Sequence, residues 1–238
     1  MSMALPKLNV PKYKLKLPSD NRTVNYRPFL VKEEKLLLIA TETGEQPELI
    51  DAIKTIISNC TDIKDVDKLS TFDIEYVFLK IRTKSVGETV DVIVTCPDDN
   101  ETTVNVSIPL DDINVVKNKK HKTELKLSDE VAITMGYPSL DMFVKLNFGE
   151  GEDQIKQLFE MATSCVKTIS DPNQVYDCAD ITKKELMEWF EELNSKQFAM
   201  VQEFFDTMPK LQHTIKVTNP NTAVESDIVL EGLASFFG

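Results

Sequence analysis

The sequence is poor in the residue types that most catalytic and metal-binding motifs require. Its 238 residues include only 7 glycines, 4 cysteines and 2 histidines. The chain has no glycine-rich phosphate loop, no G-x-S-x-G nucleophile turn and no H-E-x-x-H zinc motif. It also has no Gly/Ser-rich linker or low-complexity tract, so no flexible hinge between independent domains is expected. We therefore predict a protein that is not an enzyme and that has no catalytic residues and no cofactor.

Positive charge is also scarce, because 27 Lys and Arg stand against 39 Asp and Glu and give a net charge of −12. This sign opposes sequence-independent binding to nucleic-acid phosphates. No apolar run approaches the roughly 20 residues of a membrane span, and no segment resembles a secretory signal. We predict no nucleic-acid binding and no membrane insertion, and we expect a cytoplasmic protein. The lysine-rich run from Lys117 to Lys122 is interpreted as a solvated loop.

The cysteines do not follow the spacing of a metal site. They are Cys60, Cys96, Cys165 and Cys178. A zinc site usually includes two cysteines that are two to four residues apart, whereas Cys96 is followed by Pro97 and three polar turn residues. A nucleophilic thiol would need a base, for which only His121 and His213 are available. We predict free thiols and no metal, although a site assembled from distant residues such as Cys60, Cys178 and the histidines stays open.

The apolar pattern predicts an α+β fold in which antiparallel β-hairpins pack with amphipathic helices. Alternating residues predict hairpins over 13–29, 88–110, 123–138 and 211–238. Helical periodicity predicts helices over 30–43, 47–60 and 152–170, one that begins at Ser70, and a long helix near residues 182–208. The helix over 152–170 includes Val166 and Ile169 on its apolar face. Thr182 and Glu185 form a capping box at the start of the long helix.

The order of these elements suggests two regions. Residues 1–150 form an N-terminal hairpin, helix and hairpin region, and residues 151–238 form a C-terminal helical region that ends in a hairpin. Because no linker separates them, the two regions are also compatible with one compact unit.

Two of the hairpins have similar sequences. "VTCPDDNETTVNVSIPL" (94–110) and "VTNPNTAVESDIVLEGL" (217–233) both have Val-Thr, one residue, Pro, a polar turn and a strand. The likeness is interpreted as a repeated hairpin form, because Pro and Asn are common in turns. The second copy has Asn219 where the first has Cys96, so we interpret Cys96 as a turn residue without chemistry of its own.

Aromatic residues gather in two places. Those near residues 189–205 are interpreted as the buried face of a helix. Phe236 and Phe237 stand immediately before the last residue, where a chain end usually frays unless it docks. They are either an anchor in the protein's own core or a contact with a neighbouring subunit, and we take them as candidate partner-binding residues.

Three stretches carry a resemblance to a known family. They are "YRPFLVKEEKLLLIA" (26–40), "FDIEYVFLKIRTKSVGETVDVIVTCP" (72–97) and the final strand that leads to "LEGLASFFG" (228–238). Together with the order of elements over residues 5–238, they resemble the baseplate hub subunit family of T4-like contractile-tail bacteriophages. The resemblance implies a structural or assembly protein of the tail baseplate hub that acts through protein–protein interfaces.

The resemblance further implies that the partners are other baseplate hub and tail proteins, with self-association as a further alternative. It implies that the protein is in the host cytoplasm during assembly and in the tail baseplate of the virion. The rival hypothesis is a tail assembly chaperone or binding module that is absent from the mature virion. Some relatives carry cysteine pairs of the zinc-knuckle kind in the two similar turns, but this chain has only Cys96 there, so metal binding is not carried over.

Overall fold

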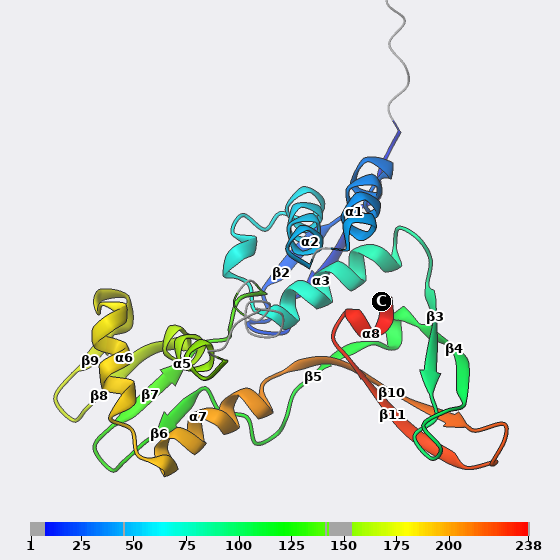
Figure 1. The fold of residues 1–238 in the computed structure, drawn as a ribbon. Coiled ribbons are helices and arrows are strands. Elements are labelled where there is room, and N and C mark those ends of the chain that lie inside the picture. Colours follow the sequence, from blue (N-terminus) through cyan, green and yellow to red (C-terminus); the bar gives the residue numbers. More distant parts are fainter. Residues whose placement is uncertain (1–7, 45, 141, 143–153, 238) are drawn as a thin grey trace, which may run out of the picture. The chain divides into compact units, whose positions relative to one another are not determined.

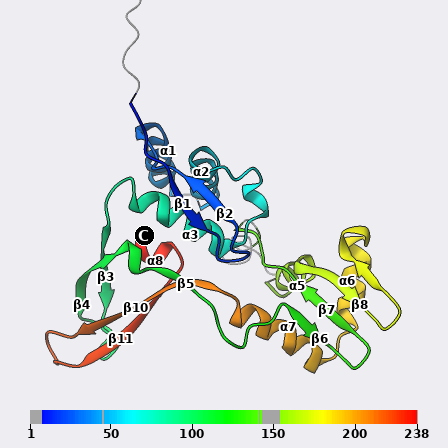
Figure 2. The ribbon, with the colours of Figure 1, turned by 180° about the vertical axis from the view of Figure 1, so that it is seen from behind.

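The computed structural model describes residues 8–44, 46–140, 142 and 154–237, and these residues form two compact units. The first unit contains the described residues up to Val66 together with Phe72–Asn114 and 211–237. The second unit contains Asp67–Thr71 and the described residues of 115–210. Figures 1 and 2 show the ribbon from opposite sides. The predicted boundary near residue 150 lies outside the described residues and stays a prediction.

The N-terminal part of the first unit has the predicted hairpin and helices. Its elements are β1 (Tyr13–Lys16), β2 (Thr23–Tyr26), α1 (Val31–Thr43), α2 (Gln46–Cys60) and α3 (Thr71–Thr83), with a 3-10 turn η1 (Val66–Lys68) that crosses the boundary between the units. β1 and β2 are antiparallel, and α1 packs against α2. One apolar side of α3 is buried, including Ile74, Val77 and Ile81. α1 ends at Gly44, whose φ of +69° gives the left-handed conformation that glycine adopts easily.

Two further hairpins and a short helix complete the first unit. They are β3 (Thr89–Thr95) with β4 (Thr103–Pro109), β10 (Lys210–Thr218) with β11 (Glu225–Glu231), and α8 (Ala234–Phe237), beside the 3-10 turn η2 (Leu110–Asp112). The tips of the two hairpins lie together in both ribbon views (Figures 1 and 2). Each hairpin buries one face, which includes Val92 and Val94 in β3 and Ile215 and Val217 in β10. Alternation therefore predicted these strands correctly.

The three hairpins in the described residues of the first unit are closed by the same kind of turn. Each turn begins with a buried residue, continues with proline, and has its fifth residue in the left-handed conformation. That fifth residue donates its backbone N–H to the carbonyl oxygen of the first residue, at 2.9 Å in every case. The pairs of first and fifth residues are Leu17 and Asn21, Cys96 and Asn100, and Asn219 and Ala223. The sequence likeness of the second and third turns thus reflects a shared backbone conformation.

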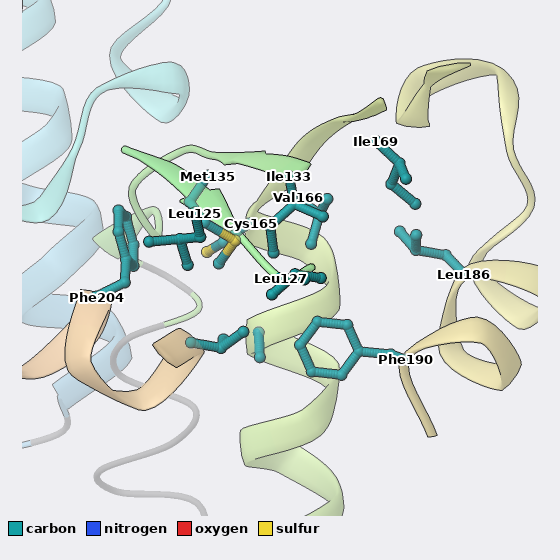
Figure 3. Close-up of a cluster of buried hydrophobic side chains, with 12 residues drawn as sticks. Leu125, Leu127, Ile133, Met135, Cys165, Val166, Ile169, Leu186, Phe190 and Phe204 are labelled. Carbon is teal, nitrogen blue, oxygen red and sulfur yellow. The ribbon is translucent and has the colours of Figure 1, made fainter. Parts of the chain in front are cut away.

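In its described residues, the second unit has a four-stranded antiparallel sheet and the helices α5 (Gln154–Cys165), α6 (Lys183–Glu191) and α7 (Ser195–Thr207). The strands of the sheet follow the order β6 (Glu124–Lys126), β7 (Ala132–Met135), β8 (Val166–Ser170) and β9 (Val175–Asp177). The strand β5 (Asn114–Val116) begins at the boundary between the units, and η3 (Cys178–Asp180) follows β9. Figure 3 shows the core of this unit, where side chains of the sheet meet Phe190 of α6 and Phe204 of α7.

The predicted helix over 152–170 is wrong in its last part, Val166–Ser170. The helix ends at Cys165, and Val166–Ser170 is the strand β8, which pairs with β7. Val166 and Ile169 are both buried, and their spacing of three residues looked helical. In the strand, this spacing arises because the pairing with β7 shifts register between Thr134 and Met135. The β-branched residues of this stretch favour the strand.

The predicted long helix near residues 182–208 is also wrong, because it is two helices. α6 begins after the predicted capping box of Thr182 and Glu185, which is confirmed, and ends at Glu191. Asn194 then caps α7, since its side-chain oxygen accepts hydrogen bonds from the backbone N–H groups of Lys196 and Gln197. Apolar spacing continued across the break, so periodicity alone did not reveal it. The α+β class itself is confirmed.

Candidate functional site

The predicted partner-binding residues lie in the short C-terminal helix α8. This helix packs against β3 and β11 of the first unit. Phe236 is only 1% exposed, so its side chain is part of the core of its own unit. The side chain of Phe237 lies outside the described residues. A partner can therefore meet Phe236 only if α8 leaves its position, and the partner-binding role of both residues stays a prediction.

A carboxylate of α3 holds the turn that precedes α8. Oε1 of Glu75 accepts a hydrogen bond of 3.2 Å from the backbone N–H of Leu233. Gly232 has a φ of +70°, and a Cβ at this position would stand 3.1 Å from the same oxygen. Burial raises the pKa of Glu75 to about 7, against the lowering effect of the Leu233 hydrogen bond and with a further rise from the charge of Glu231. No local sequence pattern indicates this contact, because Glu75 and Leu233 are 158 positions apart.

The two turns with similar sequences contact each other, and we call residues 96–102 and 219–224 the turn pair. The side-chain nitrogen Nδ2 of Asn219 lies 3.0 Å from both carboxylate oxygens of Asp98 and 2.9 Å from Oδ2 of Asp99. The hydroxyl of Thr222 donates to Asp98. Nδ2 of Asn221 donates to Oγ1 of Thr102 at 2.9 Å. Three polar side chains of one turn thus form hydrogen bonds with three polar side chains of the other.

These hydrogen bonds also set the charge of the turn pair. The pKa of Asp98 is lowered by the hydrogen bonds from Thr222 and Asn219. The pKa of Asp99 is lowered by the hydrogen bond from the Thr102 hydroxyl and by the backbone N–H groups of Glu101 and Thr102. Both carboxylates are therefore ionised at neutral pH, and the amide of Asn219 is the group that faces them.

The thiols are placed in surroundings that keep them protonated. Cys60, Cys96 and Cys165 are buried, and Cys178 is partly buried. Burial raises the pKa of Cys60 to about 11 and that of Cys165 to about 12. The pKa of Cys96 is raised by burial and by the charges of Asp98 and Asp99. Because the thiolate is the form that attacks carbonyls and binds metals, these surroundings disfavour both roles. Within the described residues, no three His, Cys, Asp or Glu side chains lie close enough together to hold a metal.

His121 is packed into the second unit, although it lies in the lysine-rich run. Its Nε2 is 3.0 Å from the hydroxyl of Tyr137, and its Nδ1 is 3.1 Å from Oγ1 of Thr207. The Thr207 hydroxyl donates to the carbonyl oxygen of Glu203, so it accepts a hydrogen bond from Nδ1–H, and Nε2 accepts one from Tyr137. Burial lowers the pKa of His121. The neutral ring thus attaches the exposed lysine loop to α7, a role that the sequence pattern did not indicate.

Helix α1 exposes large apolar side chains. Val31 is 79% exposed, Leu38 is 60% exposed and Ile39 is 48% exposed. Their spacing of seven and eight residues places them on one side of the helix, opposite the buried Glu33 and Ala40. We call these three residues the α1 surface. The sequence predicted the helix but not this exposure, because apolar residues occur on every side of α1.

The buried Glu33 anchors the start of α1. Its carboxylate accepts hydrogen bonds of 2.9 Å from Nη2 of Arg27 and 2.8 Å from the backbone N–H of Leu30. Burial works to raise the pKa of Glu33, but the hydrogen bonds from Arg27, Leu30 and Lys32 outweigh it, so the pKa is lowered. Arg27 also donates to the carbonyl oxygen of Asn59 in α2. This charged group fixes α1 to its neighbours and leaves the α1 surface facing outward.

Comparison with known proteins gives one family and one curated relative. The family described as T4 bacteriophage base plate protein matches residues 10–238. The baseplate hub assembly protein gp26 of Enterobacteria phage T4 is 22% identical over 225 residues, which cover 94% of this chain and 97% of the relative. No solved structure matches the chain. No helix in the described part of the chain is long and apolar enough to cross a membrane.

Proposed function

Because the chain belongs to the family of T4 bacteriophage base plate proteins, we propose that it assembles the hub of a phage tail baseplate by binding other hub and tail proteins. The family match over residues 10–238 is the observation that carries this proposal. The T4 relative is named a baseplate hub assembly protein and aligns with nearly its whole length. A structural or assembly role in a phage baseplate follows from the family. The proposal adds that the chain acts in the hub of the baseplate and that it binds other hub and tail proteins.

The proposed role works through interfaces and involves no catalysis. The buried thiols with raised pKa values support this, since a catalytic cysteine needs a lowered pKa and access to substrate. His121 is held by Tyr137 and Thr207 on both of its ring nitrogens, so it is not poised as a general base. The protein is then present in the host cytoplasm while the baseplate forms and in the tail of the virion afterwards.

The α1 surface supports a contact with another baseplate protein. Apolar side chains that gather on the outside of a soluble protein commonly mark a protein–protein interface. Val31 and Leu38 lie two helical turns apart and are both mostly exposed, so a partner could cover them together. Phe236 and Phe237 are the second proposed contact, and they require α8 to detach before Phe236 is accessible.

The experiment is an affinity purification of the tagged chain from infected host cells, with the co-purified proteins identified by mass spectrometry. The proposal predicts that baseplate hub and tail proteins are enriched over a purification with an unrelated tagged protein. An absence of every baseplate protein would contradict it. Purified virions distinguish the two roles: the chain is present in them if it is a structural subunit, and absent if it is a chaperone that acts only during assembly.

A further inference from the structure

The turn pair has the residue spacing at which metal-binding knuckles supply their ligands. In each turn, the first and fourth residues are separated by two positions, which is the spacing of the two cysteines in many zinc sites. These residues are Cys96 and Asp99 in one turn and Asn219 and Thr222 in the other. The two turns face each other, as their side-chain hydrogen bonds show. The four positions therefore match the four ligand positions of paired knuckles in spacing, on two turns that contact each other.

The side chains at these positions do not fit a zinc ion. Only Cys96 carries a sulfur, and its pKa is raised by burial and by the neighbouring aspartates. Oδ1 of Asn219 accepts a hydrogen bond of 2.8 Å from the backbone N–H of Asn221, which fixes the orientation of the amide. The NH₂ group of Asn219 consequently points at Asp98 and Asp99. The amide NH₂ group is a hydrogen-bond donor and has no lone pair with which to bind a cation. Asn219 therefore cannot act as a metal ligand through the group that lies where the two turns meet.

We propose that the turn pair is a metal-independent clasp in which the Asn219 amide takes the place of a bound cation. The amide is 1% exposed and directs its hydrogen atoms at two ionised carboxylates, so it provides the positive end of a dipole where a metal would provide charge. The clasp joins residues about 120 positions apart and fixes the tips of the β3–β4 and β10–β11 hairpins to each other. This inference rests on the structure of the first unit alone and is independent of the proposed function.

The clasp is tested with Asn219→Asp, which keeps the shape of the side chain but replaces the NH₂ group by an oxygen and so adds a third carboxylate beside those of Asp98 and Asp99. The matched control is Asn105→Asp, the same chemical change at an exposed position of β4. We expect Asn219→Asp to lower the Tm by about 5 °C or more, because hydrogen bonds to charged groups are lost and like charges are brought together. Asn105→Asp should leave the Tm within about 2 °C.

The same melting experiments are repeated after dialysis against a chelator. The Tm of the wild-type protein is expected to stay unchanged, and elemental analysis of the natively purified protein is expected to find no stoichiometric zinc. A fall in Tm on chelation would contradict a metal-independent clasp. Equal melting of the Asn219→Asp and Asn105→Asp variants would contradict the role of the amide.

A second variant tests the equivalence of the four positions. Asp99→Cys, Asn219→Cys and Thr222→Cys together place a thiol at every knuckle position beside Cys96. The geometry predicts that this variant binds one zinc ion per chain, gives the cobalt absorption of a tetrahedral thiolate site, and loses Tm on chelation. A folded variant that binds neither metal would overturn the equivalence. If the variant does not fold in the presence of zinc, the equivalence is equally refuted, because a fitting metal should stabilise it.

Discussion

Phe236→Ala is expected to destabilise the first unit strongly, because the side chain of Phe236 is 1% exposed and fills space beside β3 and β11. Truncation of a buried phenylalanine to alanine removes its transfer free energy and leaves a cavity, which together cost about 3–5 kcal/mol. For a chain of this size, each kcal/mol lowers the Tm by roughly 2–4 °C. The expected fall in Tm is therefore about 6–20 °C.

The assay is thermal unfolding followed by calorimetry, with Phe236→Leu as the conservative control. Leucine keeps much of the apolar volume, so the control should recover more than half of the lost Tm. If α8 were only loosely attached in solution, Phe236→Ala would change the Tm by less than about 2 °C. That result would refute the burial of the C-terminal helix in its own unit and would favour a free partner-binding segment.

Three further changes probe other parts of the chain. Glu75 has a folded pKa of about 7, above its usual value of 4.5, so its contribution to stability is lost as the pH rises from about 4.5 to 7. Glu75→Gln should remove this part of the pH dependence of the Tm, and an unchanged pH profile would show that Glu75 is not buried. Leu38→Glu should reduce the co-purification of baseplate proteins without lowering the Tm. The control Val175→Glu, at a similarly exposed position of β9, should leave co-purification unchanged. Equal co-purification with both variants would exclude the α1 surface as a contact. Asn194→Ala should cost about 1 kcal/mol by removing the cap of α7, and an unchanged Tm would indicate that the helix does not begin there.

The hairpins could be predicted because their information is local. The alternation of apolar and polar residues predicted β3 and β4, and the proline after Cys96 indicated the turn between them. The likeness of the turns at Cys96 and Asn219 also predicted a shared form, which the backbone hydrogen bonds confirm. The sequence did not show that the two turns contact each other, since nothing local specifies which distant residues a polar turn meets.

The errors in the helices have a common physical cause. The burial of Val166 and Ile169 depends on a register shift against β7, so a strand took on a spacing that is typical of a helix. The break before α7 depends on the hydrogen bonds of a single side chain, Asn194, within an otherwise continuous apolar pattern. Periodicity records which residues are buried but not which backbone conformation buries them.

The candidate contact residues were predicted only in part. Phe236 and Phe237 stood out in the sequence because a chain end usually frays unless it docks, and the structure adds that the side chain of Phe236 is buried in its own unit. The exposure of Leu38 depends on where α2 and the Arg27–Glu33 ion pair attach α1, which requires the folded arrangement. The role of Glu75 also required the folded structure, because its hydrogen-bond partner Leu233 is distant in sequence.

If the chain assembles the baseplate as proposed, phage that lack the chain cannot complete this structure. Electron microscopy of baseplates from cells infected with such phage measures this directly. We expect complete baseplates to be missing and to reappear when the wild-type chain is supplied from a plasmid. Normal numbers of complete baseplates without the chain would contradict the proposed assembly role.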